Sequence, residues 1–232
     1  MKSIAIIPAR SGSKRIPNKN TIELGAKPMI QWTIEAALEA RIFDRILVST
    51  DDQKLQEKCK LFGVESPFLR TSYFDDHSPV SLATIEALNQ AEQYWCESYD
   101  LVFQLLPNCP LRDCEDIRTF YQTVCSSKPG SFLTCFDLGW ANPWWSLQLE
   151  GDGKAKFLFP DMLNKRSQDL PNLYAVSGAI WAAHKQQLLK AKSFYTESKK
   201  FLPISRVHAL DIDSYEDLEM AEFYIQKSIN KL

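Results

Sequence analysis

The stretch SIAIIPARSGSKRIPNKN, residues 3–20, joins an apolar run to a basic loop near the N-terminus. Residues 3–8 are almost wholly apolar, which predicts a short buried β-strand. The loop that follows contains Arg10, Lys14, Arg15 and Lys19 and no acidic residue. In an open α/β sheet, ligands bind beyond the carboxyl ends of the strands, so this loop is a candidate site for an anion.

Outward from this stretch, short apolar runs alternate with amphipathic segments. We expect further strands at residues 45–50, 101–106, 131–136 and 175–183. We expect helices at residues 28–40, 51–63, 81–95, 114–125 and 215–229. This alternation predicts an α/β fold with a mostly parallel, doubly wound sheet that helices cover on both faces.

Residues 138–173 interrupt this pattern, because they contain no long periodic helix. The segment carries Trp140, Trp144 and Trp145, and residues 150–160 are typical of part of a hairpin. We interpret the whole chain, residues 1–232, as a single domain with this segment as an inserted arm. The tryptophans fit a contact surface between subunits, and packing within the arm explains them nearly as well.

Composition excludes several classes of function. The formal net charge of -2 argues against binding of nucleic acid over a whole surface. No stretch approaches the roughly 20 apolar residues of a membrane span, and the short N-terminal apolar run does not fit a signal peptide. The six cysteines form no CxxC pair, which favours reduced thiols. We expect a cytoplasmic protein.

The loop has the chemistry of a phosphate site. Gly12 allows close approach to the backbone, Ser13 offers donors, and Arg10 can make paired hydrogen bonds to a phosphate. Lys14 and Lys19 add compact charges. The loop matches neither the GxxxxGK[ST] motif nor the dinucleotide GxGxxG motif. On composition alone, a basic loop that faces water is the simpler explanation.

Asp211 and Asp213 lie two residues apart in the segment ALDIDSYEDL. In an extended segment their side chains would point to the same side. Carboxylate oxygens of this kind suit Mg²⁺, which takes one or two carboxylates together with phosphate oxygens. Alternatively, Asp213 or Ser214 caps the last helix.

The string PARSGSKRIPNKN, residues 8–20, resembles the nucleotide-binding signature of the acylneuraminate cytidylyltransferases, which activate sialic-acid-like sugars. The resemblance runs in order over almost the whole chain. It includes the segments GAKPMIQWTIEAAL, ILVSTDD, PFLRTSYFDDHSPVSLATIEAL, LLPNCPLR, KRSQDLPNLYAVSGAIW and ALDIDSYEDLEMAE. Ser11 stands where the family usually has glycine. Leu106, Asn108 and Cys109 stand in place of Gln, Thr and Ser, which bears on the identity of the sugar more than on the reaction.

The resemblance implies a Rossmann-like cytidylyltransferase that uses CTP to activate a nine-carbon 2-keto sugar acid, giving the CMP-sugar and pyrophosphate. It implies catalytic roles for Arg10, Lys19 and Asp211, and Mg²⁺ held by Asp211 and Asp213. It also implies a homodimer formed through residues 138–173, which act as a dimerisation arm. The implied nucleotide- and sugar-binding residues are Arg10, Gly12, Ser13, Lys14, Asn20, Arg70, Ser81, Asn108, Arg166 and Gln168.

Several alternatives stay open at this point. The acceptor could be an eight-carbon keto-deoxy acid, the paired aspartates could belong to a D-x-D glycosyltransferase, or the chain could be a nucleotide-binding regulator without turnover. Arg70 could lie at the surface, Arg166 could face water, and Ser81 could cap the helix at residues 81–95. Asp51 and Asp52 are expected to cap the helix at residues 51–63.

Overall fold

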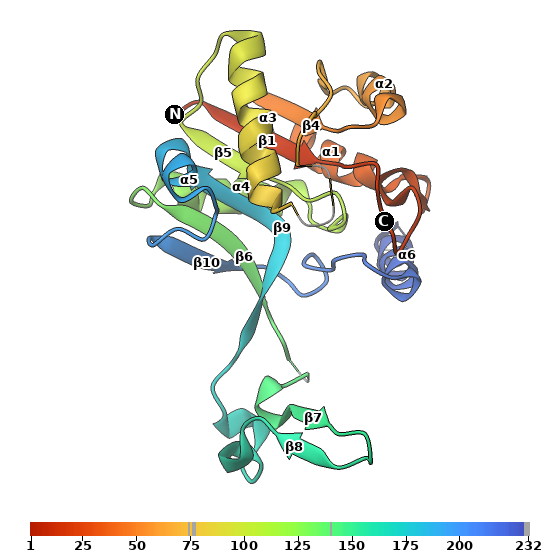
Figure 1. Ribbon diagram of the computed structural model, residues 1–232, viewed down its shortest axis with the longest axis vertical. Helices are drawn as coiled ribbons and strands as arrows, with labels where there is room; N and C mark the ends of the chain where they lie inside the picture. The colour runs from red at the N-terminus through yellow and green to blue at the C-terminus, as the bar shows by residue number, and fades with distance from the viewer. Residues whose placement is uncertain (74, 76–77, 140, 230–232) are drawn as a thin grey trace.

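The computed structural model describes residues 1–73, 75, 78–139 and 141–229, and it shows a sheet-centred body from which a narrow arm projects (Figure 1). The central sheet has the strand order β10-β6-β9-β5-β1-β4. Its strands are β1 (Ser3–Pro8), β4 (Arg45–Ser49), β5 (Leu101–Gln104), β6 (Ser131–Asp137), β9 (Tyr174–His184) and β10 (Lys199–Pro203). Strand β9 runs antiparallel to its two neighbours, and the other pairs are parallel. The predicted α/β class and mostly parallel sheet are confirmed.

Helices cover both faces of the sheet. The side chains of β1 alternate between the two faces and so contribute to two separate cores. Ala5 and Ile7 belong to a cluster that includes residues of α1 (Met29–Ala40), α2 (Gln53–Leu61) and α4 (Cys114–Cys125). Ile4 and Ile6 belong to a second cluster with residues of α3 (Val80–Trp95) and α5 (Lys185–Ala191). The sheet is therefore doubly wound, as the apolar runs predicted.

The last helix, α6 (Tyr215–Ile229), packs against the N-terminal part of the chain. Ala221 and Ile225 share a buried cluster with Ile16, Leu24 and Met29. A small hairpin, β2 (Glu23–Leu24) and β3 (Lys27–Pro28), and the 3-10 helix η1 (Lys19–Thr21) lie in the same region. This packing brings the segment before α6, which contains Asp211 and Asp213, to the loop after β1.

The strand order places a crevice at the carboxyl end of β1. This strand pairs with β4 on one side and with β5 on the other. Strand β1 connects to β4 on one side, whereas β5 connects to β6 on the other side. The connections that leave β1 and β5 therefore run in opposite directions, which is the topological arrangement that opens a binding crevice in doubly wound sheets. The loops after β1 and β5 both face this crevice.

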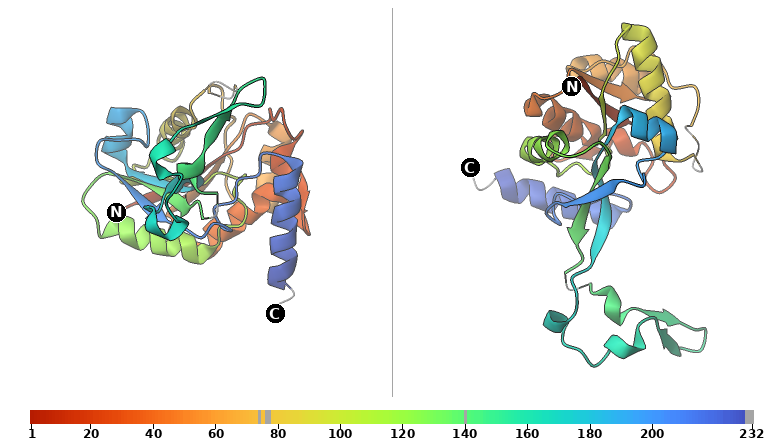
Figure 2. Two further views of the ribbon diagram at one scale, coloured as in Figure 1. Left: turned by 90° about the horizontal axis from the view of Figure 1, so that it is seen from below. Right: turned by 90° about the vertical axis from the view of Figure 1, so that its left-hand side faces the viewer.

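The arm projects from the ends of β6 and β9, well away from the body (Figures 1 and 2). It contains the antiparallel pair β7 (Leu147–Leu149) and β8 (Ala155–Phe157), which confirms the predicted hairpin. It also contains the 3-10 helices η2 (Pro143–Trp145), η3 (Pro160–Met162) and η4 (Ser167–Asp169). Trp144 packs edge-on against Phe159 within the arm, and Trp140 lies outside the described residues.

Several boundaries differ from the sequence-based expectations. Strand β5 ends at Gln104, because the chain turns away from the sheet after Leu105 donates its backbone N–H to Ile6. Helix α5 and edge strand β10 were not predicted. All six cysteines are free, as expected. In the described part of the chain, no helix has the length and apolar character needed to cross a bilayer.

The contact between β6 and β10 gives a test of the packing. A Cβ at Gly130 would lie 2.5 Å from the backbone oxygen of Ser198. Since backbone cannot rotate away, Gly130→Ala should lower the free energy of unfolding by about 1–3 kcal/mol in urea denaturation. Gly151→Ala is the control, because a Cβ there would meet nothing within 4 Å. Equal stability of the two variants would contradict this close packing.

Candidate active site

A cavity of about 650 Å³ opens at the carboxyl ends of β1 and β5. The loop after β1 contributes Arg10, Gly12, Ser13, Lys14, Lys19 and Asn20 to its lining, all predicted binding residues. The loop after β5 contributes Leu106, Pro107 and Asn108. The fold therefore brings the basic loop to a hollow large enough for a nucleotide.

The basic loop is fastened at two points. The side-chain amide of Asn20 donates to the backbone oxygen of Arg10 at 2.8 Å, which joins the end of the loop to its beginning. Ser11 donates its backbone N–H and its hydroxyl to the carboxylate of Asp51, at 2.8 and 2.6 Å. A Cβ at Gly12 would meet nothing within 4 Å, so protein packing does not require glycine there.

Lys19 connects the loop to the C-terminal segment. Its ammonium group donates to the backbone oxygen of Ile212 at 2.9 Å and to Asp213 Oδ1 at 3.0 Å. The backbone N–H of Ile212 donates in turn to the backbone oxygen of Asn108 at 2.8 Å, and the amide of Asn108 donates to Asp211. Predicted residues from three distant parts of the sequence thus meet at one place.

Arg15 is a residue of this site that the sequence analysis did not select. Its Nη2 lies 2.9 Å from Asp213 Oδ2, so Arg15 and Lys19 pair with different oxygens of one carboxylate. The side chain of Arg15 is 69% exposed, whereas that of Lys19 is 16% exposed. Arg15 is therefore the partner that Asp213 can exchange more easily for another cation.

The start of α6 does not use the carboxylate of Asp213 as a cap. Instead, Asp217 Oδ2 accepts from the backbone N–H groups of Asp213 and Ser214, and Ser214 Oγ accepts from the N–H of Asp217. The capping alternative for Asp213 is therefore wrong, and capping falls to Ser214 and Asp217. The carboxylate of Asp213 pairs instead with the charged groups of the cavity, Arg15 and Lys19.

The carboxyl group of Asp211 has an unusual environment. Although the residue as a whole is exposed, desolvation of its carboxyl group, with a further contribution from the charge of Asp213, raises the pKa of Asp211 to about 6. Two neighbouring carboxylates match the hard oxygen ligands of a divalent cation. The donor set therefore fits Mg²⁺.

Arg70 lies in the connection between α2 and α3, at the wall of the cavity. The residue is only 4% exposed, and two of its nitrogens, Nε and Nη2, have no hydrogen-bond partner. Burial lowers the pKa of this guanidinium, and the charge of Asp51 opposes that shift. A buried arginine with unsatisfied donors beside a cavity is costly unless a ligand completes its bonding, so a surface role is excluded.

Some predicted residues lie elsewhere. Ser81 is buried in the first turn of α3 and is neither the N-cap residue nor part of the cavity lining. Arg166 and Gln168 are exposed and do not line the cavity of their own chain. They belong to the arm, which projects from the body (Figure 1). Asp52 caps α2 as expected, since it accepts from the N–H of Lys54 at 2.8 Å. The cap predicted for Asp51 is wrong, because its carboxylate binds Ser11.

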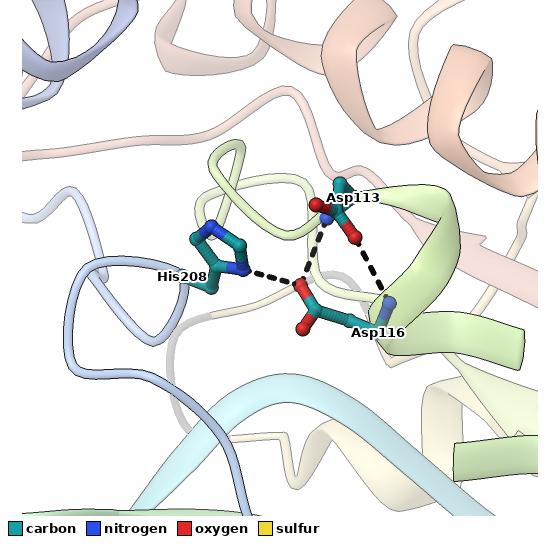
Figure 3. Close-up of side chains that lie close together, drawn as sticks. All are labelled: Asp113, Asp116 and His208. Carbon is teal, nitrogen blue, oxygen red and sulfur yellow. Dashed lines mark hydrogen bonds and ion pairs between the residues drawn. The ribbon is translucent and has the colours of Figure 1, made fainter. Parts of the chain in front are cut away.

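A second charged cluster joins the start of α4 to the segment before Asp211 (Figure 3). Asp113 and Asp116 form a reciprocal capping box at the start of α4, and His208 Nδ1 lies 2.7 Å from Asp116 Oδ2. The hydrogen bond to Asp116 raises the pKa of His208. The ligand atoms of the three residues lie within 4.8 Å of one another, and capping accounts for their arrangement. The pair ties the segment before Asp211 to the helix that follows Asn108.

Comparison with known sequences identifies the family. The sequence model of a family described as cytidylyltransferase matches residues 4–137, which include β1, the basic loop and the loop after β5.

The chain belongs to the cytidylyltransferase family.

This cytidylyltransferase is similar along its length to two characterised relatives. It is 32% identical to the CMP-N,N'-diacetyllegionaminic acid synthase of Legionella pneumophila, over 96% of this chain and 95% of that protein. It is 29% identical to a pseudaminic acid cytidylyltransferase of Campylobacter jejuni, again over 96% and 95% of the two chains. The predicted resemblance and enzyme class, a nucleotidyltransferase, are confirmed.

A solved structure shares the fold. The structure of a CMP:2-keto-3-deoxy-manno-octonic acid synthetase complexed with CTP aligns with a TM-score of 0.73 and 19% sequence identity. The alignment covers 98% of this chain and 100% of the other. At this identity, the likeness supports the fold and says nothing of the substrate. Cytidylyltransferases generally use a divalent metal ion.

The raised pKa of Asp211 predicts the acidic limb of the pH profile. Below about pH 6 its carboxyl group is protonated and cannot act as a cation ligand, so kcat/KM of this cytidylyltransferase should rise as pH increases through about 6. The measurement is the rate of pyrophosphate release against pH at a Mg²⁺ concentration well below saturation, because bound Mg²⁺ competes with the proton for the carboxylate. His208→Gln is the control for the nearby histidine, and this variant should show the same rise of kcat/KM through about pH 6. A limb near pH 4 in the wild type would contradict the assignment.

Proposed function

We propose that the protein transfers CMP from CTP to the anomeric hydroxyl of a nine-carbon 2-keto sugar acid and releases pyrophosphate. The observation that carries the proposal is the contact of Lys19 with Asp213, which brings the basic loop and one of the paired carboxylates into one cavity. The other carboxylate, that of Asp211, accepts a hydrogen bond from Asn108, which lines the same cavity. The names of the two full-length relatives support an acceptor of the pseudaminic or legionaminic type.

The residues of the cavity suit nucleotidyl transfer, which needs positioning and charge neutralisation more than covalent chemistry. We place the triphosphate in the loop of residues 10–20. Arg10, Lys14 and Lys19 then stabilise the negative charge that develops on the departing pyrophosphate. The acceptor hydroxyl attacks the α-phosphate in line, on the side of the cavity where Asn108 and Asp211 lie.

We propose Mg²⁺ as the cation that Asp211 and Asp213 hold. When bound there, the ion would neutralise phosphate oxygens and lower the pKa of the attacking hydroxyl. Arg15 and Lys19 pair with Asp213, and Asn108 orients Asp211 by its hydrogen bond.

The remaining predicted residues have proposed roles in binding. Arg70 would donate its unsatisfied nitrogens to the nucleotide, next to donors from Gly12, Ser13 and Asn20. Ser81 would act from the first turn of α3, where its neighbour Val80 lines the cavity. Because CTP is a cytoplasmic nucleotide, we propose that the reaction takes place in the cytoplasm.

We also propose that the enzyme is a homodimer and that residues 138–173 form the contact. The arm and its base expose large apolar side chains, including Leu149, Leu158, Tyr174 and Val176. Such a surface favours association. In the dimer, Arg166 and Gln168 would reach the sugar site of the partner, where Arg166 could pair with the carboxylate of the acid.

Pyrophosphate release tests the reaction. With CTP and Mg²⁺, we expect release with one of N-acetylneuraminic, legionaminic or pseudaminic acid. Lys19→Ala or Asp211→Ala should lower kcat/KM by at least about a hundredfold, since each removes a charged contact in the transition state. Release only with an eight-carbon keto-deoxy acid would change the acceptor class. Binding of CTP without any release would favour a regulator, and release of free nucleotide would favour a glycosyltransferase.

Sedimentation velocity tests the dimer. Leu149 is 72% exposed on the arm, and Leu149→Asp should raise the dimer dissociation constant at least about tenfold, because it places a charge in an apolar contact. Leu61→Asp is the matched control, since Leu61 is 84% exposed at the end of α2 in the body. A wild-type monomer, or equal effects of the two substitutions, would contradict the proposed contact.

A further inference from the structure

Asp51 lies where the ends of two adjacent strands meet. Strands β1 and β4 pair in parallel with Pro8 opposite Ser49, and the N–H of Ala9 extends this pairing to the backbone oxygen of Ser49 at 2.9 Å. The residues that follow the two strands therefore run side by side. This places the carboxylate of Asp51 against Ser11, inside the basic loop.

Both oxygens of the Asp51 carboxylate accept hydrogen bonds from Ser11. Oδ1 accepts from the backbone N–H at 2.8 Å and Oδ2 accepts from the hydroxyl at 2.6 Å. The start of helix α2 does not need Asp51, because Asp52 supplies the cap and its own backbone N–H donates to Thr50 Oγ1 at 3.0 Å. The two neighbouring aspartates thus have separate tasks.

The same carboxylate faces Arg70. Asp51 Oδ1 lies 3.8 Å from Arg70 Nη2, beyond hydrogen-bond distance but close enough for a strong charge interaction in a buried setting. The backbone N–H of Arg70 donates to Thr50 at 2.7 Å, which fixes the two segments together. Burial and the charge of Arg10 both disfavour a charged guanidinium, and Asp51 opposes them.

We propose that Asp51 is a positioning residue for the nucleotide. It holds the start of the phosphate loop through Ser11 and holds the guanidinium of Arg70 in place, although Asp51 does not line the cavity. This inference rests on the proposed function, in which CTP occupies the cavity. It also assigns a task to Ser11, whose hydroxyl a glycine at that position would lack.

The decisive experiment compares CTP binding to the wild type, Asp51→Asn and Asp52→Asn by calorimetry in the presence of Mg²⁺. Asp51→Asn should weaken CTP binding at least about tenfold, because it removes the charge on which both contacts depend. The KM for the sugar acid should stay within about threefold. Asp52→Asn should lower Tm through loss of the cap and leave CTP affinity within about twofold.

Double substitution separates positioning from general destabilisation. If Asp51 acts through Arg70, Asp51→Asn should cost less CTP affinity in an Arg70→Ala background than in the wild type. If the losses in CTP affinity caused by Asp51→Asn and Arg70→Ala are additive, Asp51 does not act through Arg70. A CTP affinity of Asp51→Asn within about twofold of the wild type, or parallel losses in CTP affinity, sugar KM and Tm, would overturn the proposal.

The design keeps this inference distinct from the proposed reaction. If the wild type binds CTP but releases no pyrophosphate with any acid, the reaction proposal fails and the binding comparison still decides the role of Asp51. If the wild type does not bind CTP, tripolyphosphate replaces it as the probe of the loop. Absence of binding to both probes would overturn the inference as well.

Discussion

The salt bridge between Lys19 and Asp213 is the contact on which the site depends, since it joins residues 194 positions apart in the sequence. Lys19 comes from the loop after the first strand and Asp213 from the segment before the last helix. Neither segment is part of the central sheet, so sheet pairing alone does not align them. The apolar cluster of Ile16, Leu24 and α6 supplies the burial that keeps them together. Chemistry at this site therefore relies on the last helix being docked on the body.

Carboxylates of the protein itself hold the basic loop in place. Carboxylates meet the loop at both ends, Asp51 at Ser11 and Asp213 at Arg15 and Lys19. These contacts are mostly at the surface, where ion pairs contribute little free energy and can be exchanged. An incoming polyphosphate can take over cations from the carboxylates without the loop having to refold. The site is thus preformed, because the protein's own carboxylates occupy the loop in the way that the bound anion would.

Local patterns predicted most of the fold, and long-range contacts account for what was missed. The helix at 114–125 and the last helix at 215–229 have the bounds that periodicity indicated, because their apolar faces are regular. Strand β10 was missed because this edge strand is mostly exposed and lacks a continuous apolar run. Within the site, the paired aspartates and the basic loop could be selected by residue type and motif. The roles of Arg15 and Asp51 could not be predicted, because that of Arg15 depends on the packing of α6 and that of Asp51 on the pairing of β1 with β4.

The arm is inserted between β6 and β9 at a point where it does not disturb the pairing of the central sheet. Asp137 at the end of β6 pairs directly with Tyr174 at the start of β9, so both ends of the insertion leave from the same rung of an antiparallel ladder. A tight turn could close the chain there with the register of every other strand unchanged. The length and surface of the arm are thus free to vary between related proteins while the nucleotide cavity is kept.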